Sequence, residues 1–151
     1  MAVNPDSTDL RIRPIRAADY EAVCDLWRAA DLPARLSGRE APDAFLRQLA
    51  HHPDTYLLAE VDEHLAGVVL GTHDHRKGWI NRLAVHPDFR SRGVAQALLA
   101  ACEHALRRNG LEIVSALIEH GNDASRAAFE RAGYLADLPV HYYRKRFRAE
   151  I

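Results

Sequence analysis

Apolar residues recur along this chain with two different spacings, and each spacing predicts one kind of element. Apolar residues three or four positions apart indicate amphipathic helices, which we expect over 17–30, from about 41 to 51, over 93–108 and over 122–132. Short apolar runs bounded by turn residues indicate strands, which we expect over 10–16, 55–61, 65–72, 79–85, 111–118 and 140–147.

The order of these elements indicates how the sheet is built. The strands come first as a meander and later alternate with helices, an order typical of a mixed sheet in an α/β (α+β) fold. The chain has 151 residues, about the length of one domain, so we expect a single domain over 10–151. Residues 1–9 are polar and predict a flexible N-terminal arm.

Charge and composition narrow the classes of function. Lys and Arg number 20 against 21 Asp and Glu, and a net charge of -1 argues against a nucleic-acid-binding surface, which needs a cationic surplus. No apolar run approaches the roughly 18 residues of a membrane span. The first residues carry neither the basic nor the apolar region of a signal peptide. We therefore expect a cytoplasmic protein without nucleic-acid or membrane partners.

The two cysteines, Cys24 and Cys102, lie far apart in helix-patterned segments. This placement is typical of buried core thiols in a reducing cytoplasm. A nucleophilic cysteine with a histidine partner is the alternative, although no local signature supports it.

The segment 83–95 carries the clearest chemical signal. A strand ends at His86-Pro87, and a loop containing Arg90, Ser91, Arg92 and Gly93 then opens a long amphipathic helix. Free N–H groups at a helix N-terminus bind anions such as phosphate, and a glycine lets the backbone come close to the ligand. The alternative is an ordinary helix cap with solvated arginines. A dinucleotide fingerprint does not fit, since it would follow the first strand and carry more glycines.

Two motifs in the chain resemble signatures of the GCN5-related N-acetyltransferase (GNAT) family. The first is Leu83-Ala-Val-His-Pro followed by Arg90-x-x-Gly93-x-Ala95, and the second is Asn122…Ser125…Phe129…Gly133-Tyr134. The resemblance runs from about residue 12 to 147. The stretch 71–79 is also similar to a small bacterial subgroup of the family typified by YpeA.

The resemblance implies a fold and a co-substrate. The fold is a mixed, mostly antiparallel sheet flanked by about four helices, with two strands splayed apart at the cofactor cleft. The co-substrate is acetyl-CoA, with its pyrophosphate on the N–H groups of the 90–95 loop and its pantetheine arm paired along 83–85 like an added strand. Backbone N–H groups near 83–85 would polarise the thioester carbonyl. The implied cofactor-binding residues are Leu83, Ala84, Val85, Arg90, Ser91, Arg92, Gly93, Val94, Ala95, Asn122 and Phe129.

The implied activity is transfer of acetyl to a primary amine of a small molecule or a protein, by direct attack of the amine on the thioester. Two positions depart from the family pattern. Phe129 stands where the family often has a tyrosine acid, and Asn81 stands where many members have a glutamate. These departures leave an alternative open, a non-catalytic acyl-CoA-binding sensor or partner module.

Four residues are candidates for the proton transfers. Glu119 follows the splayed strand and could hold an ammonium or relay a proton, or be an exposed loop carboxylate. Tyr142 or Tyr143 could replace the missing hydroxyl, or pack on the sheet. His75, beside His73, could serve as a base, although a solvated turn is the simpler interpretation. A metal would need a third ligand that the spacing does not supply, so we expect none. A homodimer is left open.

Overall fold

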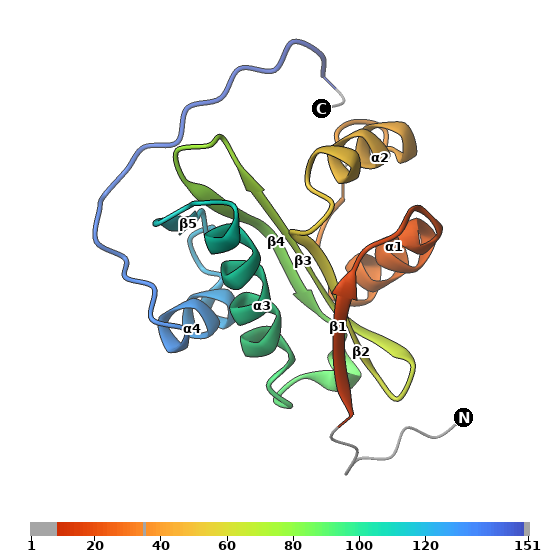
Figure 1. Cartoon of the computed structure of the whole chain (residues 1–151). Helices are drawn as coiled ribbons and strands as arrows, with labels where there is room; N and C mark the ends of the chain where they lie inside the picture. The colour runs from red at the N-terminus through yellow and green to blue at the C-terminus, as the bar shows by residue number, and fades with distance from the viewer. Residues whose placement is uncertain (1–8, 35, 150–151) are drawn as a thin grey trace.

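The computed structural model describes residues 9–34 and 36–149, and a five-stranded sheet forms its centre (Figure 1). The strands lie side by side in chain order: β1 (Leu10–Pro14), β2 (Tyr56–Val61), β3 (His64–His73), β4 (Gly78–Val85) and β5 (Val114–Ala116). Neighbouring strands are antiparallel except for β4 and β5, which are parallel.

Helices cover both faces of this sheet (Figure 1). The helices α1 (Tyr20–Ala29) and α2 (Pro42–His51) lie on one face, and α3 (Val94–Arg108) and α4 (Asp123–Arg131) lie on the other. Short 3-10 turns at Ala17–Asp19 and Pro87–Phe89 precede α1 and α3. The mixed, mostly antiparallel sheet with its four helices confirms the predicted fold class.

Each face of the sheet has its own apolar core. Under α3 the core contains Leu98, Leu99, Cys102 and Leu106, all with no exposed surface. Under α1 and α2 it contains Trp27, Phe45, Tyr56 and Val68, none more than 2% exposed. Burying one large apolar side chain stabilises a fold by about 1.5–3 kcal/mol. The two cores therefore hold the sheet between rigid layers.

An irregularity in β4 positions the candidate site. Leu70 pairs with Arg82 but the next residue, Gly71, pairs with Ile80, so Asn81 is an extra, bulged residue. The parallel pairing of β4 with β5 ends at the same level, with Ile80 opposite Ala116. Bulges bend a strand and increase its twist. From Asn81 onward β4 and β5 therefore diverge, which confirms the expected splay.

The expected strand over 140–147 is wrong. These residues form no strand in the structure and are exposed. The reason lies in their pattern, because Val140 and Tyr142 share one face with Arg144 while Tyr143 shares the other with Lys145. Burying either face against the sheet of its own chain would therefore stabilise the segment by less than the conformational entropy lost on ordering it.

Two further boundaries differ from the sequence expectation. The strand expected over 111–118 is ordered as a strand only at Val114–Ala116. The expected N-terminal arm falls at 1–9, of which 1–8 lie outside the described residues. No helix within the described part of the chain is long and apolar enough to cross a bilayer.

Candidate functional site

The loop between β4 and α3 presents backbone N–H groups to solvent. Ser91 and Gly93 adopt left-handed backbone angles, with φ of 60° and 76°. Gly93 caps α3 with no side-chain hydrogen bond, and the first turn of α3 contains no acidic residue. The free N–H groups and the positive end of the helix dipole therefore have no anionic partner here from their own turn. This arrangement is suited to an anionic ligand.

The surroundings of Gly93 are open and cationic. No atom lies within 4 Å of the position that a Cβ would occupy at Gly93. Arg90 and Arg92 are exposed on either side of the loop, and the Arg92 guanidinium lies 5.5 Å from the centre of the Phe89 ring. Phe89 is itself buried, so it anchors the loop to the core. The loop thus offers a held backbone and two arginines, which fits a phosphate-bearing group.

The edge of β4 beyond the bulge is open. Residues 82–85 pair with β3 on one side, while no strand in the described chain pairs with their other side. The side chains of Leu83 and Val85 pack toward the core under α3, and Ala84 packs into the opposite core. What this edge presents is therefore backbone, which needs hydrogen-bond partners. An extended amide-containing ligand can pair here as an added strand.

Helix α4 borders the same region. The side-chain carbonyl of Asn122 accepts a hydrogen bond from the backbone N–H of Ser125 at 3.1 Å and so caps the helix. Gln96, in the first turn of α3, donates from Nε2 to the carbonyl of Ala128 at 2.9 Å. This bond joins the start of the α3 helix to α4.

Phe129 lies in the core rather than at the surface. It is 5% exposed, and its ring meets Tyr134 edge-on with 4.9 Å between ring centres. Burial raises the pKa of the Tyr134 hydroxyl, and the neighbouring Glu103 raises it further. Position 129 therefore supplies apolar packing and no proton.

The four catalytic candidates are widely separated. Glu119 is exposed just after β5, on the side where β4 and β5 diverge, and its carbonyl accepts from the Asn122 N–H at 3.1 Å. Tyr142 and Tyr143 are exposed on an extended segment that leaves α4 and runs around the outside of the molecule (Figure 1). His75 lies in the β3–β4 turn, whereas Leu83 is about 16 Å of strand beyond Gly78. Of the four, Glu119 is the one at the open end of the sheet.

The other face of β4 holds a charged cluster that sequence reasoning missed. Arg82 donates from Nη2 to the carbonyl of Pro33 at 2.6 Å and lies 4.5 Å above the ring of Trp27. Its Nη1 lies 3.5 Å from Glu40, which also pairs with Arg39 at 3.2 Å. Burial lowers the pKa of Arg82, and Glu40 opposes that shift. The cluster ties the α1–α2 connection to the strand residue after the bulge.

A signal for this cluster was present in the sequence. Arg82 is the one charged residue of its strand, and a charge inside a buried strand is uncommon unless it is paired. Its partners, however, come from 42 or more residues away in the chain. Local patterns do not identify such partners.

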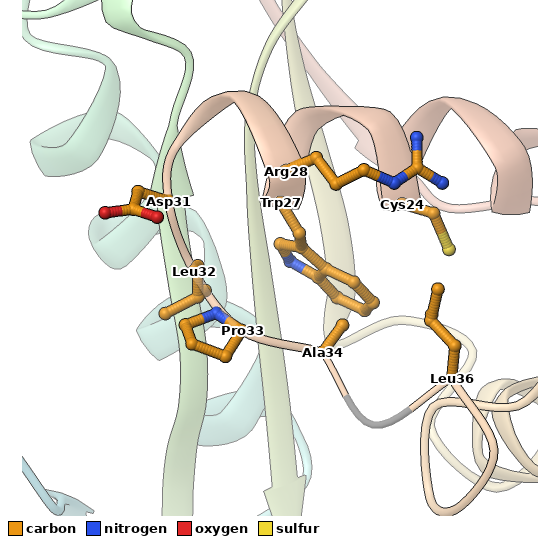
Figure 2. A pocket seen from close by; sticks show the side chains of 8 residues that line it. All are labelled: Cys24, Trp27, Arg28, Asp31, Leu32, Pro33, Ala34 and Leu36. Atoms are coloured by element: carbon orange, nitrogen blue, oxygen red, sulfur yellow. The ribbon is translucent and has the colours of Figure 1, made fainter.

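A small depression lies against the same connection (Figure 2). It has a volume of about 220 Å³, and Figure 2 shows the Trp27 ring pointing from α1 toward Ala34 and Leu36. Cys24, Arg28, Asp31, Leu32 and Pro33 complete its lining. The volume is below the roughly 300–1,000 Å³ of typical small-molecule sites, so it fits a single side-chain-sized group.

The histidines do not form a metal site. His73 and His75 lie with 4.8 Å between ring centres, and the His75 N–H donates to Nδ1 of His73 at 3.3 Å. Within residues 9–34 and 36–149, no group of three or more His, Cys, Asp or Glu side chains is arranged to hold a metal ion.

Known proteins resemble this chain in sequence and in fold. An acetyltransferase of Pectobacterium atrosepticum is 37% identical over 126 residues, which cover 83% of this chain and 87% of that protein. The PaiA N-acetyltransferase of Thermoplasma acidophilum in complex with coenzyme A superposes with a TM-score of 0.74 at 14% identity, covering 82% of this chain and 88% of that one. YncA of Salmonella typhimurium with its cofactor acetyl-CoA gives a TM-score of 0.67 at 22% identity, covering 83% and 79%.

The family assignment follows from the sequence match. The sequence profile of the acetyltransferase (GNAT) family matches residues 20–134, which include both motifs, the diverging strands and the loop at the start of α3. The finer resemblance to the YpeA-like subgroup stays a prediction. This chain belongs to the acetyltransferase (GNAT) family and uses acetyl-CoA as its co-substrate.

Proposed function

We propose that this protein transfers the acetyl group of acetyl-CoA to a primary amine of a small molecule or a protein. The observation that carries the proposal is the continuity of two open backbone surfaces. The unpaired edge of β4 begins at the Asn81 bulge and leads to the N-terminus of α3, which has no side-chain cap hydrogen bond. An acyl donor with an amide-containing arm and a phosphate group matches both surfaces.

The roles of the chain's own residues follow from this placement. The N–H groups of the loop from Ser91 to Ala95 bind the pyrophosphate, since the Arg90 N–H already donates to the Pro87 carbonyl at 3.3 Å. The exposed side chains of Arg90 and Arg92 neutralise part of its charge. The backbone of Leu83, Ala84 and Val85 holds the pantetheine arm. Those N–H groups of this stretch that point to the open edge also donate to the thioester carbonyl, where negative charge develops as the amine attacks. Asn122 closes the site from the α4 side.

The reaction also needs two proton transfers, one from the attacking amine and one to the departing thiolate. The amine nitrogen bonds to the carbonyl carbon as the carbon–sulfur bond breaks, and the nitrogen then loses a proton. We assign that proton to Glu119 or to water, since Glu119 is an exposed carboxylate at the diverging end of β5. The thiolate leaves without a side-chain acid at position 129 and takes its proton from solvent. An acid role for Tyr142, Tyr143 or a base role for His75 requires these residues to move toward the open edge of β4.

The acceptor approaches, in this proposal, from the face that carries α1 and α2. The Arg82–Pro33 hydrogen bond holds the connection between these helices against β4, next to Asn81. The depression beside Trp27 lies between α1 and this connection (Figure 2). Acceptor selection therefore rests on the connection rather than on the cofactor loop.

Binding of acetyl-CoA, measured by isothermal titration calorimetry, tests the cofactor site. Gly93→Glu places bulk and negative charge at the phosphate-binding loop and is expected to weaken binding at least about a hundredfold. Gly110→Glu is the matched control, because Gly110 also has a positive φ (86°) and no atom within 4 Å of its Cβ position. It lies at the opposite end of α3. Undiminished binding by Gly93→Glu, or an equal loss in both variants, would contradict the assigned loop.

A second function is favoured by the packing of Phe129. A buried phenylalanine at that position, together with Asn81, is what a non-catalytic acyl-CoA-binding module would carry. Release of free CoA in the presence of a broad panel of primary amines separates the two functions. Turnover with any amine supports the transferase, whereas tight acetyl-CoA binding without release supports the binding module.

A further inference from the structure

Helices α1 and α2 leave one part of their face of the sheet uncovered. Among the described residues, the core under these helices takes apolar residues from β2 and β3, but only Ala84 from β4 and none from β5. On the α3 side, by contrast, Val114, Ala116 and Ile118 all pack against the core. Side chains alternate across a strand, so the residues between them face the other way, toward α1 and α2. These residues are Ile113, Ser115 and Leu117.

The neighbouring part of β4 contributes to the same uncovered surface. Trp79 pairs with Thr72 of β3 on one side and with Ser115 of β5 on the other. The next residue, Ile80, belongs to the core under α3, so Trp79 points away from that core. Trp79 is half-buried and belongs to neither apolar core. Asn81 lies on the same face, because its Nδ2 donates to the hydroxyl of Thr72, the cross-strand partner of Trp79, at 2.7 Å.

This surface, which we call the β4–β5 face, is apolar next to the point of acetyl transfer. Its members are Thr72, Trp79, Asn81, Ile113, Ser115 and Leu117. The parallel pairing of the two strands ends one position before Leu117, so Leu117 lies level with Asn81, where the strands begin to diverge. Leu117 is 56% exposed, and Ile113 is 57% exposed. An amine that attacks a thioester in this gap therefore places its carbon skeleton against Leu117 and Trp79.

The end of the face away from the bulge is cationic. The Lys77 ammonium lies 4.2 Å from the centre of the Trp79 ring, so that ring already has one cation beside it. A hollow of about 290 Å³ follows, lined by Asp74, Arg76, Lys77 and Ile113. The Asp74 carboxylate accepts from the backbone N–H groups of Arg76 and Lys77, at 2.9 and 3.0 Å. A second ammonium on the acceptor would meet two cations and one engaged carboxylate here, so the face disfavours a polyamine.

We propose that the acceptor is a primary amine carried by an apolar body, an alkyl chain or an aromatic ring, which packs on Trp79 and Leu117. This inference rests on the acetyl transfer proposed above and names the class of amine. The nitrogen bonds to the acetyl carbon at the Asn81 bulge as the carbon–sulfur bond breaks, and the products are the N-acetylated amine and free CoA. The apolar body lies along the β4–β5 face toward Ile113. Each methylene removed from water strengthens binding about fourfold, so a partly covered chain of six carbons gains at least about tenfold over a methyl group.

Conjugates that join the sulfur of CoA to an amine through a –CH₂–CO–NH– link test this class without turnover. The amines are methylamine, hexylamine, 2-phenylethylamine and 1,6-diaminohexane, and titration calorimetry at pH 7 compares each conjugate with CoA. We expect the hexyl and phenylethyl conjugates to bind at least about tenfold more tightly than the methyl conjugate. The diaminohexane conjugate carries its free ammonium toward Arg76 and Lys77 and is expected to bind more weakly than the hexyl conjugate.

Two variants remove the apolar contacts. Trp79→Thr and Leu117→Thr keep a β-branched residue in the strand and are each expected to lose most of the hexyl and phenylethyl gain. Binding of CoA and of the methyl conjugate shows in the same titrations that each variant is folded. Leu46→Thr is the matched control, because Leu46 is an apolar residue on α2 that is 38% exposed. It is expected to keep the full gain.

The titrations separate failure of this inference from failure of the proposed function. If neither CoA nor any conjugate binds, the proposed function and the inference are both wrong. If CoA binds but the hexyl and phenylethyl conjugates bind no more tightly than the methyl conjugate, only the class of acceptor is wrong. A diaminohexane conjugate that binds as tightly as the hexyl conjugate indicates a polyamine acceptor and overturns the inference. A gain that both Trp79→Thr and Leu117→Thr retain overturns it as well.

Discussion

Gly71 sets the distance between strand β3 and helix α3. A Cβ atom at this position would overlap the sulfur of Cys102 and lie 3.2 Å from the carbonyl oxygen of Thr55. The same backbone is held in place by its own hydrogen bonds. The Gly71 N–H donates to the Thr55 carbonyl at 2.9 Å, and the Thr55 hydroxyl donates to the Gly71 carbonyl at 2.7 Å. The backbone at Gly71 and at Thr55 therefore cannot move apart to make room for a Cβ without breaking these hydrogen bonds.

Gly71→Ala is therefore expected to lower the free energy of unfolding by about 3 kcal/mol, the upper part of the range for overpacked cores. Gly78→Ala is the matched control, because its Cβ would approach only side-chain carbons of Leu106, at 2.8 Å, which can shift. A loss of about 1 kcal/mol is expected there. Urea unfolding followed by circular dichroism measures both. Equal losses would contradict the packing described at Cys102.

For single residues, the sequence predicted those site residues that lie together in one local motif. It did not predict contacts between residues that are far apart in the chain. The loop from Arg90 to Ala95 was identified from a strand, a proline turn and a helix in sequence order. Arg82 and Glu40 meet only because β4 and the α1–α2 connection fold together. No spacing in the sequence encodes that meeting.

Asn122 has a structural role that is independent of any ligand. Its side chain caps α4 through the Ser125 N–H, and α4 in turn bonds to α3 through Gln96. The same residue belongs to the family signature at the proposed cofactor site. Stability and binding therefore depend on this position for two separate reasons.

Two substitutions separate these reasons. Asn122→Ala removes the cap and is expected to lower the free energy of unfolding by about 1 kcal/mol. Asn122→Asp keeps a capping oxygen and is expected to preserve stability, while its charge weakens acetyl-CoA binding by repelling phosphate. Chemical unfolding and titration calorimetry on both variants measure the two effects. Loss of stability in Asn122→Asp, or its unchanged affinity, would contradict the dual role.

Elements with one clear apolar face were predictable from the sequence. The spacing of Val94, Leu98, Ala101 and Ala105 predicted α3 almost residue for residue, because the helix has one buried apolar face. The strand expected at 140–147 failed because its apolar and charged residues share both faces. Such a segment reads as a strand by propensity, but its burial depends on a partner outside the local pattern.

Across the whole molecule, a row of histidines joins α2 to the end of β3. The His52 ring stacks on Tyr56 at 5.9 Å between ring centres and meets His73 edge-on at 5.5 Å. His73 in turn meets His75. Burial lowers the pKa of His52, and the nearby charges of His73, His51 and His75 lower it further, while Asp54 opposes them. The Nδ1 atom of His52 is buried without a hydrogen-bond partner.

This arrangement couples folding to pH. The unfolded chain takes up the His52 proton near the ordinary pKa of 6.5, but the folded chain does so only at lower pH. Stability is therefore expected to be full above that pKa and to fall as pH drops through and below it. His52→Phe keeps the ring stack and is expected to flatten the decline between pH 7.5 and 5.5 in urea unfolding. The exposed His64→Gln is the control, and an equal slope in His52→Phe would contradict the coupling.

The mixed sheet followed from the order of the elements, since strands in a meander lie beside one another, and the flanking helices were implied by the family resemblance. The point where β4 leaves β5 did not follow, because a bulge depends on the register between strands rather than on one strand's pattern. Asn81 lies at that point, and its Nδ2 donates to the Thr72 hydroxyl at 2.7 Å.

The burial of both thiols gives the molecule two native reporters of its own motion. Cys24 lines the depression beside the α1–α2 connection (Figure 2), whereas Cys102 lies with no exposed surface beneath β3. Burial raises the pKa of both, that of Cys102 to about 12, so neither reacts as a thiolate while covered. A thiol reagent reaches Cys24 when the connection lifts from α1 and reaches Cys102 only when α3 leaves the sheet. The reaction rates of the two native cysteines therefore report local opening of the connection and global unfolding separately, without any introduced label.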